Sequence, residues 1–282
     1  MININDYSNL KFIFLLLAVL ILLLIARNFL IRRIYKRELE IANEIFIGNE
    51  EIQEDYLEVV NKSSGTMAVL ADGLGKNEAG RISSIVAVKT ISKLFKEEGN
   101  KEKITYFFKK AFNKASREII KRVEKDKGGA SVLSVIIYDN LLSYALVGDV
   151  MLAIFRNKEL VKLSNGHSIS EVAKKQYYNG KIQKDEALYA LKEKKLLYYI
   201  GQGSFRDIEI SETPIELQKS DIIILMSRGV YEGLRWIEIE RILGNKKANI
   251  NEICGQIMEN VKDNNKNNCN GSIMLMKYCG KK

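Results

Sequence analysis

A change in hydrophobic period near residue 130 is the feature that most constrains how this chain can fold. Before it, apolar residues recur at helical spacing over residues 78–97 and 103–125, which predicts two amphipathic helices. After it, the apolar residues form short strand-like runs separated by turns, at 131–138, 141–147, 150–155 and 160–163. We expect these four runs to form one β-meander. This arrangement predicts an α+β fold with helical layers outside the sheets.

Further apolar segments complete the expected domain. We expect additional strands at 66–71, 221–226 and 272–278, and additional helices at 169–194, 231–243 and 250–262. Because no repeat interrupts residues 48–282, we interpret them as one domain.

Composition excludes several classes of protein. The 282 residues are 46% apolar and 28% charged, as in a folded globular chain. The three cysteines (Cys254, Cys269 and Cys279) form no C-x-x-C pair, and His167 is the single histidine. This usage argues against a disulfide framework or a Cys/His zinc site, and it fits a reducing compartment. Cys254 lies in the apolar stripe of the helix at 250–262, where we expect it to be a small core residue.

The N-terminal segment predicts a membrane anchor. Residues 12–26 are uncharged and apolar, and with flanking residues they allow a transmembrane helix over 10–31, preceded by a short extracytoplasmic segment at 1–9. Basic residues follow the run, so we expect a single pass through the cell membrane with the N-terminus outside and the domain in the cytoplasm. A cleaved signal peptide is the alternative, but the run lacks a basic segment before it and a small-residue cleavage site after it.

The charge distribution supports a lipid partner rather than a nucleic acid. Residues 32–47 predict a basic juxtamembrane helix, and residues 10–37 as a whole are expected to contact membrane lipid. The net charge of +9 is concentrated in the first 37 residues, and the lysines of the remaining chain are scattered. We therefore expect no nucleic-acid binding.

The sharpest local motif is Asp72-Gly73, at the end of the expected strand 66–71. A carboxylate beside an accessible glycine carbonyl suits a hard divalent cation. The same dipeptide is also an ordinary turn that ends a strand.

Several other motifs recur around this one in a definite order. They are Glu54-Asp55, Gly129-Ala130-Ser131, Gly148-Asp149-Val150, Gly166-His167-Ser168 and Ser227-Arg228-Gly229. Together with Asp72-Gly73, the ordered set resembles the metal-dependent type 2C (PPM) protein serine/threonine phosphatases, over about residues 46–282. The resemblance implies a four-layer α-β-β-α sandwich of two antiparallel sheets. It also implies a pair of Mn²⁺ or Mg²⁺ ions that activate a water molecule for attack on phosphorus.

The resemblance carries over only part of the metal site. It implies metal ligands at Asp72, Gly73, Glu54, Asp55 and Asp149. Arg228 stands where the family has an aspartate, and Cys269-Asn270 stands where the family has Asp-Asn, so ligands of the second ion are missing. We expect one bound ion or none.

Arg228 changes the chemistry expected of the site. Its guanidinium stays protonated and would repel a nearby cation. It could pair with Asp72 instead, or bind a phosphate directly through its planar fork. A loop that returned Asp263 to the site is an alternative that would restore one carboxylate but leave Arg228 in place.

Three functions remain open at this stage. The first is a membrane-anchored pseudophosphatase that is deficient in metal and binds a phosphoprotein, a kinase or a membrane-complex partner. The second is an active but divergent phosphatase that depends on Mn²⁺ or Mg²⁺. The third is a structural sandwich domain that does not bind phosphate.

Overall fold

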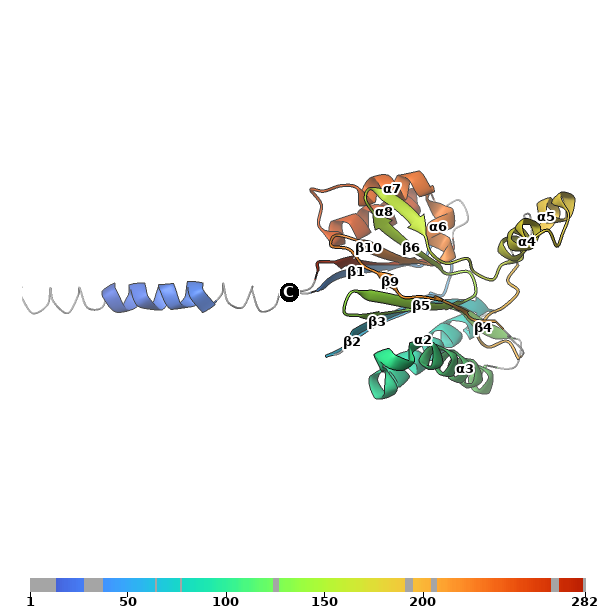
Figure 1. Ribbon diagram of the computed structural model, residues 1–282, viewed down its shortest axis with the longest axis horizontal. Helices are drawn as coiled ribbons and strands as arrows, with labels where there is room; N and C mark the ends of the chain where they lie inside the picture. The colour runs from blue at the N-terminus through green and yellow to red at the C-terminus, as the bar shows by residue number, and fades with distance from the viewer. Residues whose placement is uncertain are drawn as a thin grey trace, which may run out of the picture. The chain divides into compact units, whose positions relative to one another are not determined.

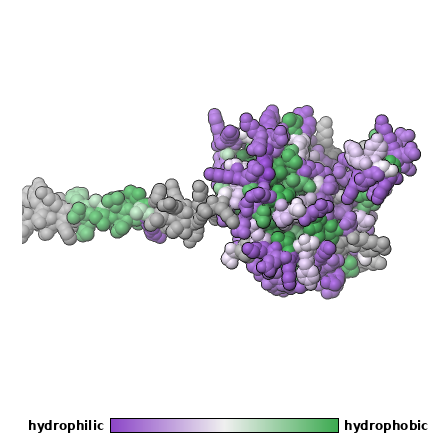
Figure 2. All heavy atoms as spheres, in the orientation of Figure 1, coloured by the Kyte–Doolittle hydropathy of each residue, from purple (hydrophilic) through white to green (hydrophobic). Residues whose placement is uncertain are grey.

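The computed structural model describes residues 14–27, 38–63, 65–76, 78–123, 127–190, 195–203, 207–264 and 269–280. The chain divides into an N-terminal unit that ends at Glu38 and a second unit, Leu39–Lys281. Residues 14–27 of the first unit are helical, and Figure 2 shows a hydrophobic surface along this segment. Within the described ranges, no helix is both long enough and apolar enough to cross a membrane. The ends of the expected span 10–31, and the expected extracytoplasmic segment 1–9, fall outside those ranges.

The expected juxtamembrane helix at 32–47 is wrong where the structure describes it. Leu39–Phe46 is strand β1, paired antiparallel with β11 (Gly271–Tyr278) along its whole length. Its side chains alternate, because Ala42 and Phe46 join the core under the helices while Leu39 and Ile41 pack between the sheets. Full-length pairing with β11 outweighs the helical tendency of this sequence. The folded domain therefore begins at Leu39 and not at residue 48.

The domain contains two antiparallel sheets. The first has the strand order β1-β11-β10-β6-β7 and the second β2-β3-β4-β5-β8, with β9 also paired to β5. The remaining strands are β2 (Tyr56–Lys62), β3 (Gly65–Gly75), β4 (Gly128–Tyr138), β5 (Leu141–Val147), β6 (Met151–Arg156), β7 (Glu159–Lys162), β8 (Glu209–Ile210), β9 (Ile215–Glu216) and β10 (Ile222–Met226).

Helices cover the outer face of each sheet. Helices α2 (Ala79–Glu98) and α3 (Ile104–Arg122) cover the sheet that contains β3, and α6 (Arg228–Gly233), α7 (Trp236–Leu243) and α8 (Ile250–Asn264) cover the sheet that contains β10. A third apolar core lies between the two sheets. Figure 1 shows the resulting layers, with α4 (Ile169–Tyr178) and α5 (Lys184–Ala190) extending away from the sandwich. The four-layer α-β-β-α sandwich is thus confirmed, and Figure 2 shows hydrophilic residues over its helical layers.

The expected four-stranded meander is wrong, because its two hairpins belong to different sheets. The hairpin β4–β5 lies in one sheet and β6–β7 in the other. The chain crosses between the sheets at Gly148, whose φ of 106° is accessible mainly to glycine. A Cβ on Gly148 would lie 2.4 Å from Ser131. This crossing places Asp149 at one end of the sandwich, between the sheets.

The expected helix at 231–243 is also interrupted. Leu234 is extended (φ −135°, ψ 135°) and separates α6 from α7. The Glu238 carboxylate then accepts a 3.2 Å hydrogen bond from the Arg235 N–H at the start of α7.

Candidate functional site

Two of the predicted ligands, Asp72 and Asp149, lie at the same end of one sheet. Asp72 of β3 is in register with Ser131 of β4. The Ser131 hydroxyl donates a hydrogen bond of 2.9 Å to Asp149 Oδ1, just after β5. Strand pairing and the crossing at Gly148 therefore bring together two carboxylates that are 77 positions apart in the sequence.

Asp55 joins this group from the start of β2 and connects it to the other sheet. It is 4% exposed, and its Oδ2 accepts a 2.7 Å hydrogen bond from the Ser227 hydroxyl at the end of β10. The same hydroxyl accepts a 2.9 Å bond from the Ser272 N–H of β11. Asp55 Oδ1 is buried and has no hydrogen-bond partner among the residues that the structure describes.

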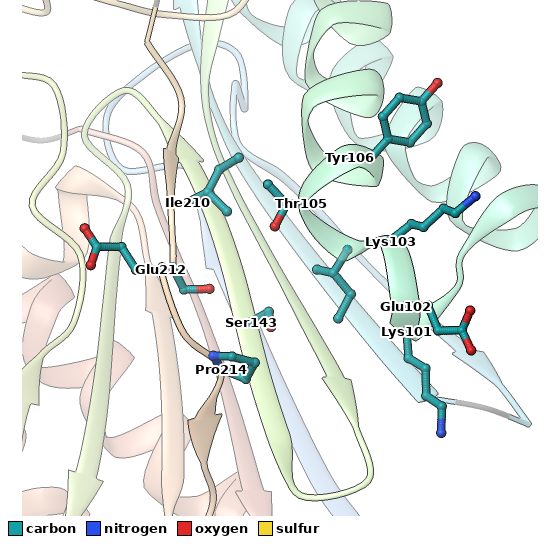
Figure 3. Close-up of a pocket in the computed structure, with 11 residues that line it drawn as sticks. Lys101, Glu102, Lys103, Thr105, Tyr106, Ser143, Ile210, Glu212 and Pro214 are labelled. Atoms are coloured by element: carbon teal, nitrogen blue, oxygen red, sulfur yellow. The ribbon is translucent and has the colours of Figure 1, made fainter.

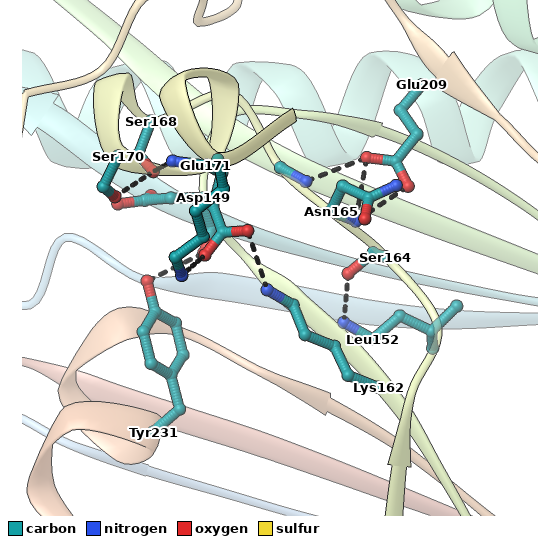
Figure 4. Close-up of polar contacts among 12 residues, drawn as sticks. Asp149, Leu152, Lys162, Ser164, Asn165, Ser168, Ser170, Glu171, Glu209 and Tyr231 are labelled. Carbon is teal, nitrogen blue, oxygen red and sulfur yellow. Dashed lines mark hydrogen bonds and ion pairs between the residues drawn. The ribbon is translucent and has the colours of Figure 1, made fainter. Parts of the chain in front are cut away.

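Arg228 lies among these three carboxylates. It follows Ser227 as the first residue of α6, and its Nη1 is 3.8 Å from Asp149 Oδ2. Burial disfavours its charge, but the negative charges of Asp149 and Asp72 outweigh this and raise the pKa of Arg228. In the same helix, the Tyr231 hydroxyl donates a 3.0 Å bond to the Asp149 carbonyl (Figure 4).

The electrostatics of the carboxylates follow from burial and mutual repulsion. Burial raises the pKa of Asp55 to about 6, although the hydrogen bond from Ser227, the nearby Ser272 hydroxyl and the charge of Arg228 oppose the shift. Burial and the charges of Asp55 and Asp149 raise the pKa of Asp72 well above its usual range, and the charge of Arg228 opposes this shift. Burial also raises the pKa of Asp149. The guanidinium therefore partly offsets the cost of placing three acidic groups close together.

Glu54 is placed differently from its neighbour Asp55. A Cβ built on Gly80 would lie 2.4 Å from Glu54 Oε1, so this carboxylate packs against the first turn of α2. A Cβ on Gly73 would lie 2.3 Å from the Gly80 carbonyl oxygen, so Gly73 permits this close approach of β3 and α2. Burial, followed by the charges of Glu50 and Asp55, raises the pKa of Glu54 to about 7.

The Gly166-His167-Ser168 motif supports the crossing loop. The Gly148 N–H donates to His167 Nδ1 at 3.2 Å, and the His167 N–H donates to the Gly148 carbonyl at 2.7 Å. The Gly166 N–H donates to Glu209, and the Ser168 hydroxyl caps α4 (Figure 4). The motif therefore fixes the loop that carries Asp149.

The remaining candidates are Cys269-Asn270, which lies close to the start of α6, and Asp263 in α8. Cys269 is near enough for the charge of Arg228 to act on its thiol, although burial raises the pKa of this cysteine overall. A Cβ on Gly229 would lie 1.9 Å from the Asn270 carbonyl oxygen, so α6 packs directly on this segment. Asp263 is exposed in the last turn of α8.

The comparison with protein families agrees with this arrangement. The family described as Protein phosphatase 2C matches residues 46–243. The chain belongs to the protein phosphatase 2C family.

Individual relatives in the family are distant in sequence but similar in fold. The chain is 26% identical over 196 residues to the serine/threonine phosphatase stp of Listeria monocytogenes, a match that covers 67% of this chain and 75% of the relative. The S. agalactiae serine/threonine phosphatase superposes with a TM-score of 0.75 at 20% identity, over 84% of this chain and 98% of that one. The catalytic domain of the phosphatase PstP, solved in complex with two manganese ions, superposes with a TM-score of 0.65 at 16% identity, over 85% and 97% of the two chains.

The residues present do not fit the two-ion centre implied for the phosphatase 2C family. The Asp149 oxygens face the Ser131 hydroxyl and the Arg228 guanidinium, and Asp55 Oδ2 accepts from Ser227. Asp55 Oδ1 remains as a buried acceptor that a cation could use. Across the described residues, no group of three or more His, Cys, Asp or Glu side chains is arranged to hold a metal ion.

The sequence motifs included Ser227 but gave it no role, and they did not include Tyr231. Ser227 connects Asp55 to the opposite sheet, and Tyr231 holds the Asp149 backbone. The position of Ser227 between a buried strand and a helix was a usable signal. The Tyr231 hydroxyl gave no signal in the sequence, because its partner is a main-chain carbonyl 82 residues away.

Proposed function

We propose that this phosphatase 2C domain is a cytoplasmic, membrane-anchored pseudophosphatase that binds a phosphorylated partner without hydrolysing the phosphate. The observation that carries the proposal is the position of Arg228, whose guanidinium faces Asp149 and acts on Asp72 and Asp55. In this proposal Arg228 supplies the positive charge that metal ions supply elsewhere in the family.

Electrostatics supports this role for Arg228. Arginine remains charged at any physiological pH. A unit charge at 4 Å repels another by about 4 kcal/mol at an effective dielectric constant near 20, and a divalent ion doubles this energy. A metal ion would also compete with the existing ion pair between Arg228 and Asp149.

The partner is proposed to be a phosphoprotein, a kinase or a complex in the membrane. Anchoring is supported by the apolar run at 12–26 and by the exposed large apolar side chains of the helix at 14–27. The basic residues that follow the run favour an outward N-terminus and a cytoplasmic domain. Protease added outside intact cells is expected to leave residues 48–282 uncut, whereas digestion of this domain would reverse the proposed orientation.

A second candidate function is an active phosphatase with a reduced set of Mn²⁺ or Mg²⁺ ligands. The buried Asp55 Oδ1, which lacks a partner within the described part of the chain, favours it because this oxygen could ligate a cation. The names of the relatives, which are phosphatases, favour it weakly.

A phosphate-release assay separates the two functions. The full chain, supplied with Mn²⁺ or Mg²⁺ and a phosphoserine peptide, is expected to release no more phosphate than its Asp72→Asn variant. Asp72→Asn is the matched control because it keeps the side-chain shape and removes the charge. Turnover by the natural chain that disappears in Asp72→Asn would establish the active phosphatase instead.

A further inference from the structure

We infer that a basic cleft beside Arg228 binds the phosphoryl group of a phosphorylated peptide, through Arg228, Lys127 and Lys195 and without a metal ion. This inference rests on the proposed function and specifies how its partner is recognised.

The cleft has a volume of about 420 Å³ and opens beside the ends of two paired strands. Gly75 of β3 and Gly128 of β4 are partners in register and contribute no side chains to it. Its walls include three basic residues: Lys127, Lys195 and Arg228. No acidic residue lines it in the described part of the chain. The excess of positive charge selects an anionic ligand.

Arg228 provides a half-buried set of hydrogen-bond donors in this cleft. Its side chain is 35% exposed, and the 3.8 Å separation from Asp149 Oδ2 exceeds hydrogen-bond distance. No residue that the structure describes accepts a hydrogen bond from the guanidinium. Its planar fork of N–H donors matches the spacing of two phosphoryl oxygens. A bound phosphate would therefore supply acceptors that none of the described residues provides.

The two lysines are held in place by main-chain pairing. Ala130 and Ile200 exchange hydrogen bonds of 2.8 and 2.9 Å, which fix the segment after Lys195 against the start of β4, just beyond Lys127. The Lys195 carbonyl also accepts a 2.9 Å bond from the Ile169 N–H. Both lysine residues are exposed at the rim of the cleft.

The apolar part of the cleft favours a peptide as the carrier of the phosphate. Leu74, Leu196 and Tyr199 line the cleft together with the basic residues. A Cβ on Gly129 would lie 2.3 Å from Tyr199 Cδ2, so the Tyr199 ring packs directly over this glycine. Side chains that flank a phosphoserine can pack on this apolar surface while the phosphoryl group reaches the cations.

A second cavity of similar volume, between the start of α3 and β5, lacks this charge asymmetry (Figure 3). Lys101 and Lys103 are accompanied there by Glu102 and Glu212. It lies beside Ser143, near the start of β5, whereas Asp149 follows the end of that strand. A phosphoryl dianion therefore has better complementarity with the cleft beside Arg228.

The test is peptide binding by the full chain, kept in solution with a non-ionic detergent. Fluorescence anisotropy compares a labelled phosphoserine peptide that has leucine beside the phosphoserine with its unphosphorylated twin, both in the presence of EDTA. We expect only the phosphopeptide to bind. Arg228→Lys, which keeps the charge but loses the fork, should weaken binding about tenfold, the usual scale for a hydrogen-bonded charge.

Charge reversal at the rim provides the matched comparison. Lys195→Glu and Lys127→Glu should each weaken binding by about threefold to tenfold. Lys181→Glu makes the same change in net charge at an exposed residue beyond the end of α4, and it should leave binding unchanged.

Several results would overturn the inference: equal binding of the two peptides, loss of binding in EDTA, no binding, or equal effects of Lys195→Glu and Lys181→Glu. Failure of the proposed function can be told apart from failure of this inference. If the proposed function is wrong, the natural chain releases phosphate from the same peptide in the presence of Mn²⁺. Such turnover leaves the cleft assignment standing if the rim variants still weaken peptide binding.

Discussion

The Ser227 hydroxyl donates a hydrogen bond to Asp55, a buried acid of the site. Asp55 accepts from Ser227 at 2.7 Å, while its other oxygen has no partner in the described structure. Ser227→Ala would leave both oxygens of a buried carboxyl without a hydrogen bond. A buried group that loses its partner costs about 1–3 kcal/mol, so we expect the free energy of unfolding in urea to fall by about 2 kcal/mol.

The control for Ser227→Ala is Ser83→Ala. Ser83 is a buried serine of α2 whose hydroxyl has no partner among the described residues. Removing this hydroxyl should leave the free energy of unfolding nearly unchanged, because no hydrogen bond is lost and alanine favours a helix. Equal destabilisation by the two variants would contradict the role given to Ser227.

His167 gives the domain a specific pH dependence. Burial lowers its pKa below the ordinary 6.5, more than the charges of Asp207 and Glu209 raise it. The unfolded chain therefore binds a proton more readily than the folded chain, and the stability contributed by neutral His167 falls as the pH drops through 6.5. His167→Asn keeps an acceptor for the Gly148 N–H but does not titrate. We expect its free energy of unfolding to fall less than that of the natural chain between pH 7.5 and 5.5.

The difference between the two proteins is the informative quantity in this experiment. Glu54 and Asp55 have raised pKa values of about 7 and 6, so their ionisation lowers stability as the pH rises, opposite in sign to the effect of His167. These acids are present in both proteins, and their contributions cancel in the comparison. Parallel pH profiles would show that the His167 pKa is not lowered.

At the scale of elements, long periodic segments were predictable and short or paired ones were not. The stripes of α3 and α8 and the apolar run of β10 come from local spacing, so their positions follow from the sequence. The two-residue strands β8 and β9 have no period to detect. The transfer of the chain to the second sheet at Gly148 has the same local signal as a hairpin turn, so only tertiary packing distinguishes the two.

Strand β1 is another element whose local sequence does not predict its structure, and a truncation experiment tests its importance. It pairs over its whole length with β11 and buries Ala42 and Phe46 against the sheet and α8. Loss of one buried aromatic side chain alone costs about 3–5 kcal/mol, a large part of the 5–15 kcal/mol typical of a domain. A chain that begins at residue 48 should therefore fail to show a cooperative thermal transition, whereas one that begins at residue 38 should unfold cooperatively. Equal transitions for both chains would show that β1 is dispensable.

At the scale of the whole molecule, the sandwich brings groups from two sheets to one end. Asp72 and Asp149 come from one sheet, and Ser227 and Arg228 come from the end of β10 in the other. The family resemblance carried by the ordered motifs implied that these residues would share one site. The direction of the Glu54 side chain depends on its packing against Gly80, which no local pattern encodes. Membership of the family thus accounts for the fold, and in the proposed function the charge at position 228 determines what the site can bind.

Metal-dependent stability tests this account on the whole protein. A ligand that binds only the folded state stabilises it by about 2.7 kcal/mol at 100 times its dissociation constant. If Arg228 supplies the positive charge internally, millimolar Mn²⁺ should leave the melting temperature of the natural chain unchanged.

The double variant Arg228→Asp, Cys269→Asp should be less stable without metal, because it adds two acidic groups to Asp72, Asp149 and Asp55 and removes the cation that opposes them. Mn²⁺ should then raise its melting temperature, and calorimetric titration should detect the new sites. Stabilisation of the natural chain by Mn²⁺ would instead mean that its carboxylates hold the ion despite Arg228, and the active phosphatase would become the better account.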